Sequence, residues 1–204
     1  MTTTAPAVRR ATGADTAAAA RSLARAFVDD PVMSWLFPDE PGRVHALERF
    51  FAIELDRVHL RTGEVWTTES ATSAALWAPP GRWRVPVGTL LREGPSLLRV
   101  FGRRTLLGLR GLSRVEARHP RWPHWYLAIL GTDPDWQGKG FGSAVMSPVL
   151  QRCDEESLGA YLESSKESNI PYYRRHGFEV VDEVDMPHGP RVWLMWREPE
   201  RDSA

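Results

Sequence analysis

Residues 125–143 of the chain read WYLAILGTDPDWQGKGFGS, and this stretch decides the fold. Residues 126–130 are all apolar, and so short a run, bounded by Gly131 and Pro134, predicts a buried strand. Three glycines then occupy alternate positions between 138 and 142, and residues 144–153, AVMSPVLQRC, have the apolar spacing of an amphipathic helix. The sequence therefore predicts a strand, a glycine loop and a helix in succession.

A glycine loop between a strand and a helix has the geometry of a phosphate-binding site. Glycine lets the backbone approach an anion closely, and the first N–H groups of a helix have no intrahelical partner. The dinucleotide fingerprint G-x-G-x-x-G does not fit the G-x-G-x-G spacing found here. A P-loop would need glycine in place of Asp133 and Ser or Thr in place of Gly140. A phosphate cradle of another spacing and an ordinary glycine-rich turn stay open as alternatives.

The order Gln137-x-x-Gly140-x-Gly142 resembles the acetyl-CoA pyrophosphate loop of the GNAT superfamily of N-acetyltransferases. The resemblance implies an α/β fold of the GNAT acyl-CoA N-acyltransferase type, with a central mixed β-sheet of about six or seven strands flanked by helices. It implies acetyl-CoA as co-substrate, backbone N–H groups that hold the pyrophosphate, and a strand that splays from its neighbour to admit the pantetheine arm. The implied cofactor-binding residues are Leu130, Gly131, Thr132, Gln137, Gly138, Lys139, Gly140, Phe141, Gly142, Ser143 and Asn169.

Several of these assignments have a plain structural alternative. The carbonyl of the thioester would accept from a backbone N–H near Leu130 or Gly131, which residue type cannot identify. Lys139 would add charge beside the pyrophosphate, or it is a solvated loop lysine. Asn169 resembles the family asparagine that bonds the pantetheine arm, and it also fits a helix cap.

Residues 169–178, NIPYYRRHGF, carry the second motif of the resemblance. In the family a tyrosine lies four residues before a Gly-Phe pair, and Tyr173 has that spacing before Gly177. The resemblance implies that Tyr173 is the acid that protonates the leaving thiolate. A phenol of pKa near ~10 stays protonated at neutral pH and suits that task. Packing against Phe178 is the alternative role for Tyr173.

Glu163 is the candidate general base, because it ends a predicted strand, 159–163, beside the predicted cofactor strand. A carboxylate there takes a proton through water or binds a cationic amine. His176 and His188 are the other candidates, each with a structural role as its alternative. Glu54 lies at the edge of the apolar face of a predicted helix and is interpreted as a structural carboxylate.

Length and composition predict a single N-acetyltransferase domain over residues 1–204, with a cofactor-binding core at about 124–197 and substrate-side helices at about 15–60 and 89–118. The net charge is zero, so no nucleic-acid partner is expected. No apolar run approaches the roughly 20 residues of a membrane span, and the first residues lack a secretion signal. With a single cysteine, Cys153, no disulfide framework or metal site is expected, and the cytoplasm is favoured.

The remaining elements follow from periodicity and turn residues. A helix after Asp15, capped by that residue, ends at 29–31, and a connection leads to a second helix that begins near Pro41. Residues 82–118 carry 9 basic and 2 acidic residues, which favours a solvated helical hairpin over a surface for nucleic acid or membrane. The other predicted elements are strands at 8–11, 64–68, 74–78, 178–185 and 191–197, a helix at 169–176 and a turn at 186–190.

Several segments narrow the resemblance to the actinobacterial enzymes related to puromycin N-acetyltransferase, among them YLESS at 161–165 and PHGPRVWLMWREP at 187–199. That likeness implies acetyl transfer to a primary amine of a small molecule, aminoacyl or antibiotic-like, by direct attack in a ternary complex. A homodimer is left open. The alternatives are a protein acetyltransferase acting on lysine or an N-terminus, and a non-catalytic acyl-CoA-binding module.

Overall fold

The computed structural model describes residues 6–62, 64–84, 94, 98 and 100–200. Within them, seven strands form one sheet in the order β1-β2-β3-β4-β5-β7-β6. The β4–β5 pair is parallel and the other neighbours are antiparallel. The strands are β1 (Val8–Arg10), β2 (Glu64–Thr68), β3 (Ser73–Ala78), β4 (Trp125–Thr132), β5 (Ala160–Ser164), β6 (Phe178–Asp185) and β7 (Arg191–Arg197). This is the mixed sheet that the sequence predicts.

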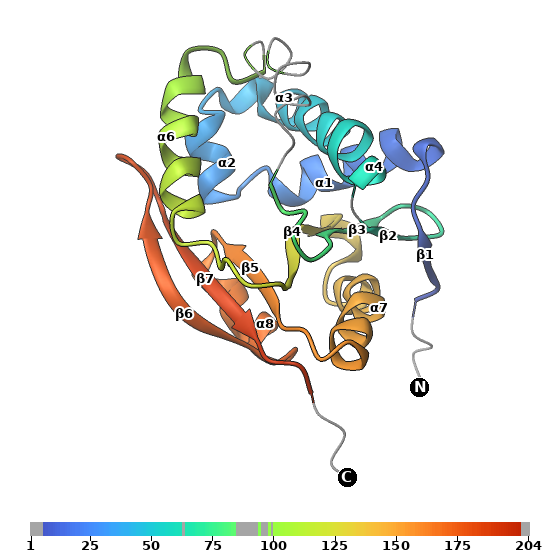
Figure 1. Cartoon of the computed structure of the whole chain (residues 1–204). Coiled ribbons are helices and arrows are strands. Elements are labelled where there is room, and N and C mark those ends of the chain that lie inside the picture. Colours follow the sequence, from blue (N-terminus) through green and yellow to red (C-terminus); the bar gives the residue numbers. More distant parts are fainter. Residues whose placement is uncertain (1–5, 63, 85–93, 95–97, 99, 201–204) are drawn as a thin grey trace.

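Helices cover both faces of the sheet (Figure 1). On one face lie α1 (Thr16–Phe27), α2 (Pro31–Leu36), α3 (Glu40–Ile53), a π-helical turn (Glu54–His59) and α4 (Leu60–Thr62). On the other face lie α7 (Phe141–Glu155) and α8 (Ile170–Arg174). The helix α6 (Thr105–Glu116) packs beside β6 and β7. Short 3₁₀ turns occupy Gly13–Asp15, Gly102–Arg104, Pro134–Trp136 and Glu167–Asn169.

Alternation along β3 builds the two halves of the core. Ala75 and Trp77 join the cluster that packs against α7, whereas Ala74 and Leu76 join the cluster that packs against α1 and α3. Successive side chains of a strand point to opposite faces, so one strand supports both layers. Each large apolar side chain buried in this way contributes about 1.5–3 kcal/mol.

The strand β4 differs from its predicted course in two ways. It continues through Gly131 to Thr132, although Gly131 was expected to stop it. A Cβ at Gly131 would lie 2.6 Å from Leu23 Cδ2, so glycine here allows α1 to pack closely on the strand. Pairing with β3 also skips Ala128, which forms a bulge between Leu127 and Ile129.

The parallel ladder between β4 and β5 is short. Only residues 125–127 of β4 pair with residues 160–162 of β5. Beyond this point β4 continues to pair with β3, and β5 continues to pair with β7. The facing backbone edges of β4 and β5 therefore diverge after the bulge, and the sheet has the opening that the sequence resemblance implies.

Three further expectations need correction. The helix α7 begins at Phe141, inside the glycine motif, and α2 lies in the predicted connection between the first two helices. Asp15 does not cap α1, because its carboxylate pairs with Arg9 at 2.8 Å and accepts from the N–H of Thr12. The helix predicted at 89–118 is described only as α6 and the residues next to it, and positions 85–93, 95–97 and 99 lie outside the described residues.

Candidate active site

Side-chain and backbone contacts fix the loop between β4 and α7. The side-chain amide of Gln137 donates to the carbonyl oxygen of Thr132 at 3.0 Å, which closes the loop on the end of β4. Asp133 accepts from the N–H of Asp135 at 3.1 Å, and Arg25 of α1 pairs with both carboxylates at 3.3 and 2.9 Å. The loop is thus held to the sheet and to α1.

Two glycines of the loop have backbone conformations that suit glycine alone. Gly138 has φ +72° and Gly140 has φ +82°, and no heavy atom lies within 4 Å of a Cβ built at either position. Gly140 is the N-cap residue of α7, so open space lies beside the unpaired N–H groups that begin the helix. The loop therefore presents an exposed backbone surface of the kind that binds an anion.

Gly142 has a different task. A Cβ at Gly142 would lie 2.8 Å from the Tyr172 hydroxyl and 3.4 Å from Thr132 Oγ1. The third glycine of the motif thus lets α7 approach α8, and the crowding that a side chain would cause there falls on Tyr172.

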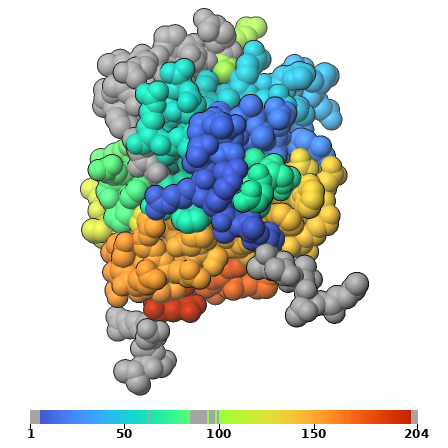
Figure 2. Space-filling view, turned by 90° about the vertical axis from the view of Figure 1, so that its right-hand side faces the viewer, coloured from blue at the N-terminus to red at the C-terminus, as the bar shows by residue number. Residues whose placement is uncertain are grey.

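A pocket of about 600 Å³ adjoins the loop. Gly138 to Gly140, one side of α7, Pro6 and His176 are among the residues that line it. Figure 2 shows the face on which the N-terminal residues (blue) lie, with yellow residues near the start of α7 beside them. Its position next to the open glycines makes this pocket the candidate site for a phosphate-bearing ligand.

His176 belongs to this pocket and lies away from the candidate base. Its Nε2 is 2.9 Å from the Ser143 hydroxyl at the start of α7. Burial lowers the pKa of His176, and the nearby charges of Arg175 and Arg197 lower it further. A neutral imidazole here orders the first turn of α7.

Lys139 is tied to its own loop. Its Nζ donates to the Asp135 carbonyl oxygen at 2.8 Å and lies 5.0 Å from the centre of the Trp136 ring. The indole of Trp136 also makes an edge contact with Phe141, with 5.2 Å between ring centres. In this arrangement the ammonium of Lys139 stabilises the loop.

Tyr173 is buried on α8 and packs its edge against Phe178, with 6.1 Å between the ring centres. Within the described residues its hydroxyl makes no hydrogen bond. Burial raises the pKa of Tyr173, and the neighbouring Tyr172 and Asp30 raise it further. The phenol is therefore protonated at neutral pH, and it also makes the packing contact considered for it.

Asp30 lies opposite Tyr173, and sequence reasoning missed it. Its carboxylate caps α2 by accepting from the N–H of Met33 at 3.0 Å, and it accepts from the hydroxyl of Ser165 after β5. Burial raises the pKa of Asp30, although these two hydrogen bonds oppose the shift. In the sequence Asp30 carries only the signal of a helix cap before proline.

Glu163 is the centre of a buried hydrogen-bonded cluster on the face covered by α1 to α4. One of its oxygens accepts from the hydroxyl of Tyr126, and the other lies 3.4 Å from His119 Nδ1. The Nε2 atoms of His119 and His124 are 3.1 Å apart, and His124 Nδ1 is 2.7 Å from the carbonyl oxygen of Trp122. Neither histidine has a sequence signal beyond its position in HPRWPHWY, so both were missed.

Glu54 lies at the edge of its helix face, as interpreted, and has a neighbour that the sequence does not reveal. It begins the π-helical turn, its Oε2 is 3.6 Å from His59 Nε2, and its charge is among the causes that raise the pKa of Tyr126. Short π-helical segments are rare and frequently occur at functional sites. Glu54 therefore adds a second carboxylate to the side of the sheet that holds Glu163.

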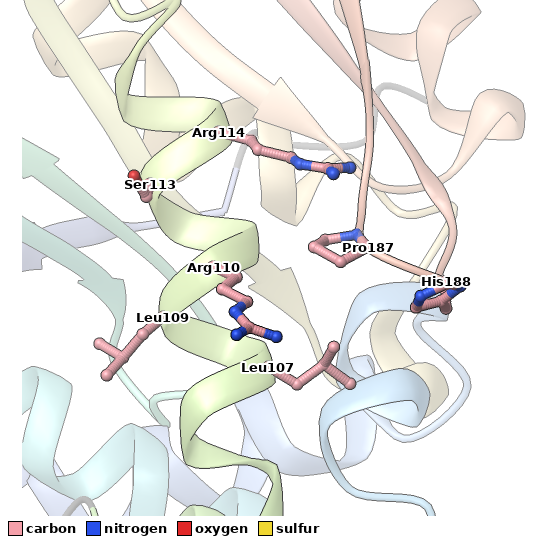
Figure 3. Close-up of a pocket in the computed structure, with 7 residues that line it drawn as sticks. All are labelled: Leu107, Leu109, Arg110, Ser113, Arg114, Pro187 and His188. Atoms are coloured by element: carbon pink, nitrogen blue, oxygen red, sulfur yellow. The ribbon is translucent and has the colours of Figure 1, made fainter.

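Two other candidates lie elsewhere. Asn169 is exposed, and its side chain makes no capping hydrogen bond to α8, so the cap alternative is wrong. His188 is exposed in the β6–β7 turn, where it lines a separate pocket of about 550 Å³. Figure 3 shows this pocket between α6 and the turn, with Arg110 and Arg114 directed toward Pro187 and His188. It contains none of the glycine-loop residues.

The model of the acetyltransferase (GNAT) family matches residues 92–178, which include the glycine loop and the motif around Tyr173. The chain is a GNAT-family N-acetyltransferase. Its fold, its splayed strands and its backbone cradle agree with that assignment. GNAT enzymes use acetyl-CoA.

Similar proteins cover nearly the whole of this acetyltransferase. An uncharacterized N-acetyltransferase of Schizosaccharomyces pombe is 29% identical, over 97% of this chain and 85% of its own. A solved acetyltransferase of Corynebacterium glutamicum, described as histone acetyltransferase HPA2 and related, has a TM-score of 0.74 at 23% identity and covers 98% and 100% of the two chains. Polyamine N-acetyltransferase of Drosophila melanogaster, an enzyme that forms N-acetylagmatine, has a TM-score of 0.59 at 15% identity and covers 94% and 99%.

These comparisons support the family and the fold, and they do not show membership of the puromycin-related group. In the part of the chain that the structure describes, no helix has the length and apolar character needed to cross a bilayer.

Proposed function

We propose that this N-acetyltransferase moves the acetyl group of acetyl-CoA to the primary amine of a small molecule, by direct attack in a ternary complex. One observation carries the proposal: the opening between β4 and β5 separates the glycine cradle and Tyr173 from a face that holds Glu163 and Glu54. An acyl donor and an amine acceptor can thus meet from opposite sides of the sheet.

The residues present fit acetyl-CoA. Backbone N–H groups between Gln137 and Ser143 would hold the pyrophosphate at the N-terminus of α7, where a Cβ on Gly138 or Gly140 would occupy open space. The pantetheine arm would enter between β4 and β5, near Asn169. An N–H of Leu130 or Gly131, beyond the bulge, would donate to the thioester oxygen as charge develops on it.

Direct attack needs an acid and a base and no nucleophilic side chain. The amine nitrogen forms a bond to the acetyl carbon, the carbon–sulfur bond breaks, and the thiolate takes the proton of Tyr173. The excess proton on nitrogen passes to Glu163. A covalent route through the thiol is disfavoured, because Cys153 is fully buried in the α7 cluster and burial raises its pKa to about 12.

The acceptor is a cationic or aminoacyl amine in this proposal. Glu54 and Glu163 place two carboxylates on the acceptor face, where they would attract an ammonium group. Of the four tryptophans considered for an aromatic site, Trp77 is core, while Trp83 stacks on His119 with 3.8 Å between ring centres. The Drosophila enzyme of the same fold acts on a polyamine-type amine, and the puromycin-related likeness adds aminoacyl amines to the candidates.

Release of free thiol from acetyl-CoA tests the function with a panel of amines. The panel should hold agmatine and polyamines, arylalkylamines, aminoacyl nucleosides, and lysine-containing and free N-terminal peptides. The proposal expects turnover with at least one small amine and little with the peptides. Preference for the peptides would support a protein acetyltransferase, and tight acetyl-CoA binding without thiol release from any amine would support a binding module.

A further inference from the structure

Glu163 does not act alone on the acceptor face, because two imidazoles connect it to the main chain. Three close contacts run in series: Glu163 Oε1 to His119 Nδ1 at 3.4 Å, His119 Nε2 to His124 Nε2 at 3.1 Å, and His124 Nδ1 to the Trp122 carbonyl oxygen at 2.7 Å. His119 is 5% exposed and His124 is 2% exposed, so water does not satisfy these nitrogens.

The number of hydrogens in this series is set by chemistry. A carbonyl oxygen only accepts, so His124 Nδ1 carries a hydrogen, and a neutral His124 then accepts at Nε2. His119 must donate from Nε2, which leaves its Nδ1 bare and facing a carboxylate. Three contacts need three hydrogens, and two neutral imidazoles supply two. The third contact forms only when the cluster binds one more proton.

The groups around the cluster favour uptake of that proton. Tyr126 donates to the second oxygen of Glu163, and Tyr161 packs its edge on His119 with 4.6 Å between ring centres. The charged groups beyond them are acidic: Glu54 acts on Tyr126, and Asp182 acts on Tyr161. Burial lowers the pKa of His124, and His119 lowers it further, which agrees with a neutral His124.

We propose that Glu163, His119 and His124 form one proton-accepting unit, in which Glu163 receives the proton of the acceptor ammonium and the two histidines position it and share the charge. This inference rests on the proposed function. With both imidazoles neutral and Glu163 ionised, the unit has charge −1. The ammonium loses one N–H proton to Glu163, its nitrogen regains the lone pair that attacks the acetyl carbon, and the unit becomes neutral with its third contact complete. After product release the proton passes to water.

His119 and His124 are positioning residues in this unit, so their loss should have a signature in pH. Without His119 the carboxylate of Glu163 keeps only its bond to Tyr126 and is a weaker base. At neutral pH kcat/KM for the amine should fall about tenfold, within the range of general base catalysis. The deficit should shrink toward pH ~9–10, where a growing share of a primary amine is already neutral.

Nuclear magnetic resonance on the wild-type protein tests the hydrogen count without any substrate. Long-range ¹H–¹⁵N correlations at pH 7, assigned through ring-to-backbone connections, report which imidazole nitrogens carry hydrogen. We expect His124 to carry hydrogen on Nδ1 alone, and His119 to carry hydrogen on Nε2. A His124 with hydrogen on Nε2 and a bare Nδ1 would overturn the series.

Kinetics tests the role of the unit. His119→Gln and His124→Gln should show the pH-dependent loss, whereas the control His45→Gln, an exposed histidine on α3, should match wild type. An equal loss at every pH, or none, would contradict the unit and indicate packing. If wild type acetylates no amine, the proposed function fails, and the resonance experiment still reports on the hydrogen series.

Discussion

The cofactor side and the acceptor side of this acetyltransferase are built differently. The cofactor side, residues 137–143 with Tyr173, uses one continuous loop whose backbone faces open space at two glycines. The acceptor side, defined by Asp30, Glu54, His119, His124 and Glu163, gathers buried or half-buried side chains from elements far apart in the chain. The first presents N–H groups, and the second presents carboxylates and imidazoles.

This difference separates a shared function from a specific one. Backbone groups exist at every position, so a loop that uses them depends mainly on glycine and on its place between a strand and a helix. Side chains that recognise an amine depend on which elements the fold brings together. We therefore expect changes on the cofactor side to affect acetyl-CoA, and changes on the acceptor side to affect the amine.

Tyr173→Phe should give the largest effect of the single changes considered. Loss of the phenolic proton donor should lower kcat by about 10²–10³-fold, the range of general acid catalysis, with little change in the Kd for acetyl-CoA. Steady-state kinetics and calorimetric titration check both quantities. The matched control is Tyr172→Phe on the same helix, whose buried hydroxyl has no hydrogen-bond partner and whose loss should change kcat by less than about threefold. Equal loss of kcat and affinity in Tyr173→Phe would indicate a packing role.

Asp154→Asn tests how firmly the frame of the cofactor side is held. Arg197 is almost fully buried, pairs with Asp154 at 2.7 and 2.9 Å, and donates to the carbonyl oxygen of His176 at 3.0 Å. Leaving this guanidinium unpaired should lower the free energy of unfolding by about 3 kcal/mol at pH 7. The control Asp185→Asn, which affects an exposed pair with Arg191, should cost about 0–1 kcal/mol in the same denaturant titration.

The same pair predicts a pH dependence. Burial raises the pKa of Asp154, but the hydrogen bonds from Arg197 and the N–H of Glu200 outweigh it, so the pKa is lowered overall. The stabilisation is then complete above the unfolded-state pKa of about 3.9 and is lost as the pH falls through the lower folded-state value. Wild type and Asp154→Asn should converge in stability in acid, and a constant difference down to low pH would count against the ion pair.

Gly140→Val addresses the cradle itself. A side chain at φ +82° would strain the backbone and fill the open space beside the N-terminus of α7, and we expect about 100-fold weaker acetyl-CoA binding. Gly81→Val is the matched control, since Gly81 has φ +76° and open space in a turn away from the loop. If both variants fold and bind acetyl-CoA as wild type does, the loop assignment fails.

Glu54→Gln should give the smallest effect and confine it to the acceptor side. Removal of one carboxylate from the face that holds Glu163 should raise the KM of a cationic amine about tenfold, typical for loss of one charge contact of about 1.4 kcal/mol. The KM for acetyl-CoA should stay within a factor of two of wild type by the same reasoning. A change in the acetyl-CoA parameter alone would remove the separation between the two sides.

The sequence predicts the sheet and the loop well because both leave local patterns. Strands 64–68, 178–185 and 191–197 have the predicted bounds, and the glycine loop lies between a strand and a helix as expected. Gly131 misled the strand boundary, because its lack of a side chain serves the approach of α1, which is a tertiary contact.

The acceptor side leaves no such pattern. His119 and His124 gain their meaning from Glu163, 39 or more positions along the chain, and from a bulge and a short parallel ladder that no residue type announces. Asp30 has the local appearance of a helix cap and performs that task as well. A residue with a local role and a distant partner is recognisable only after the fold is known.

The central claim is that backbone N–H groups at the start of α7 hold the pyrophosphate of acetyl-CoA and direct its acyl end between β4 and β5. X-ray diffraction from crystals grown with acetyl-CoA measures this directly. We predict pyrophosphate oxygens within hydrogen-bonding distance of N–H groups from residues 138–143, and the thioester beside Tyr173. A cofactor bound with its pyrophosphate elsewhere, for example against Arg110 and Arg114 between α6 and the β6–β7 turn, would contradict the account.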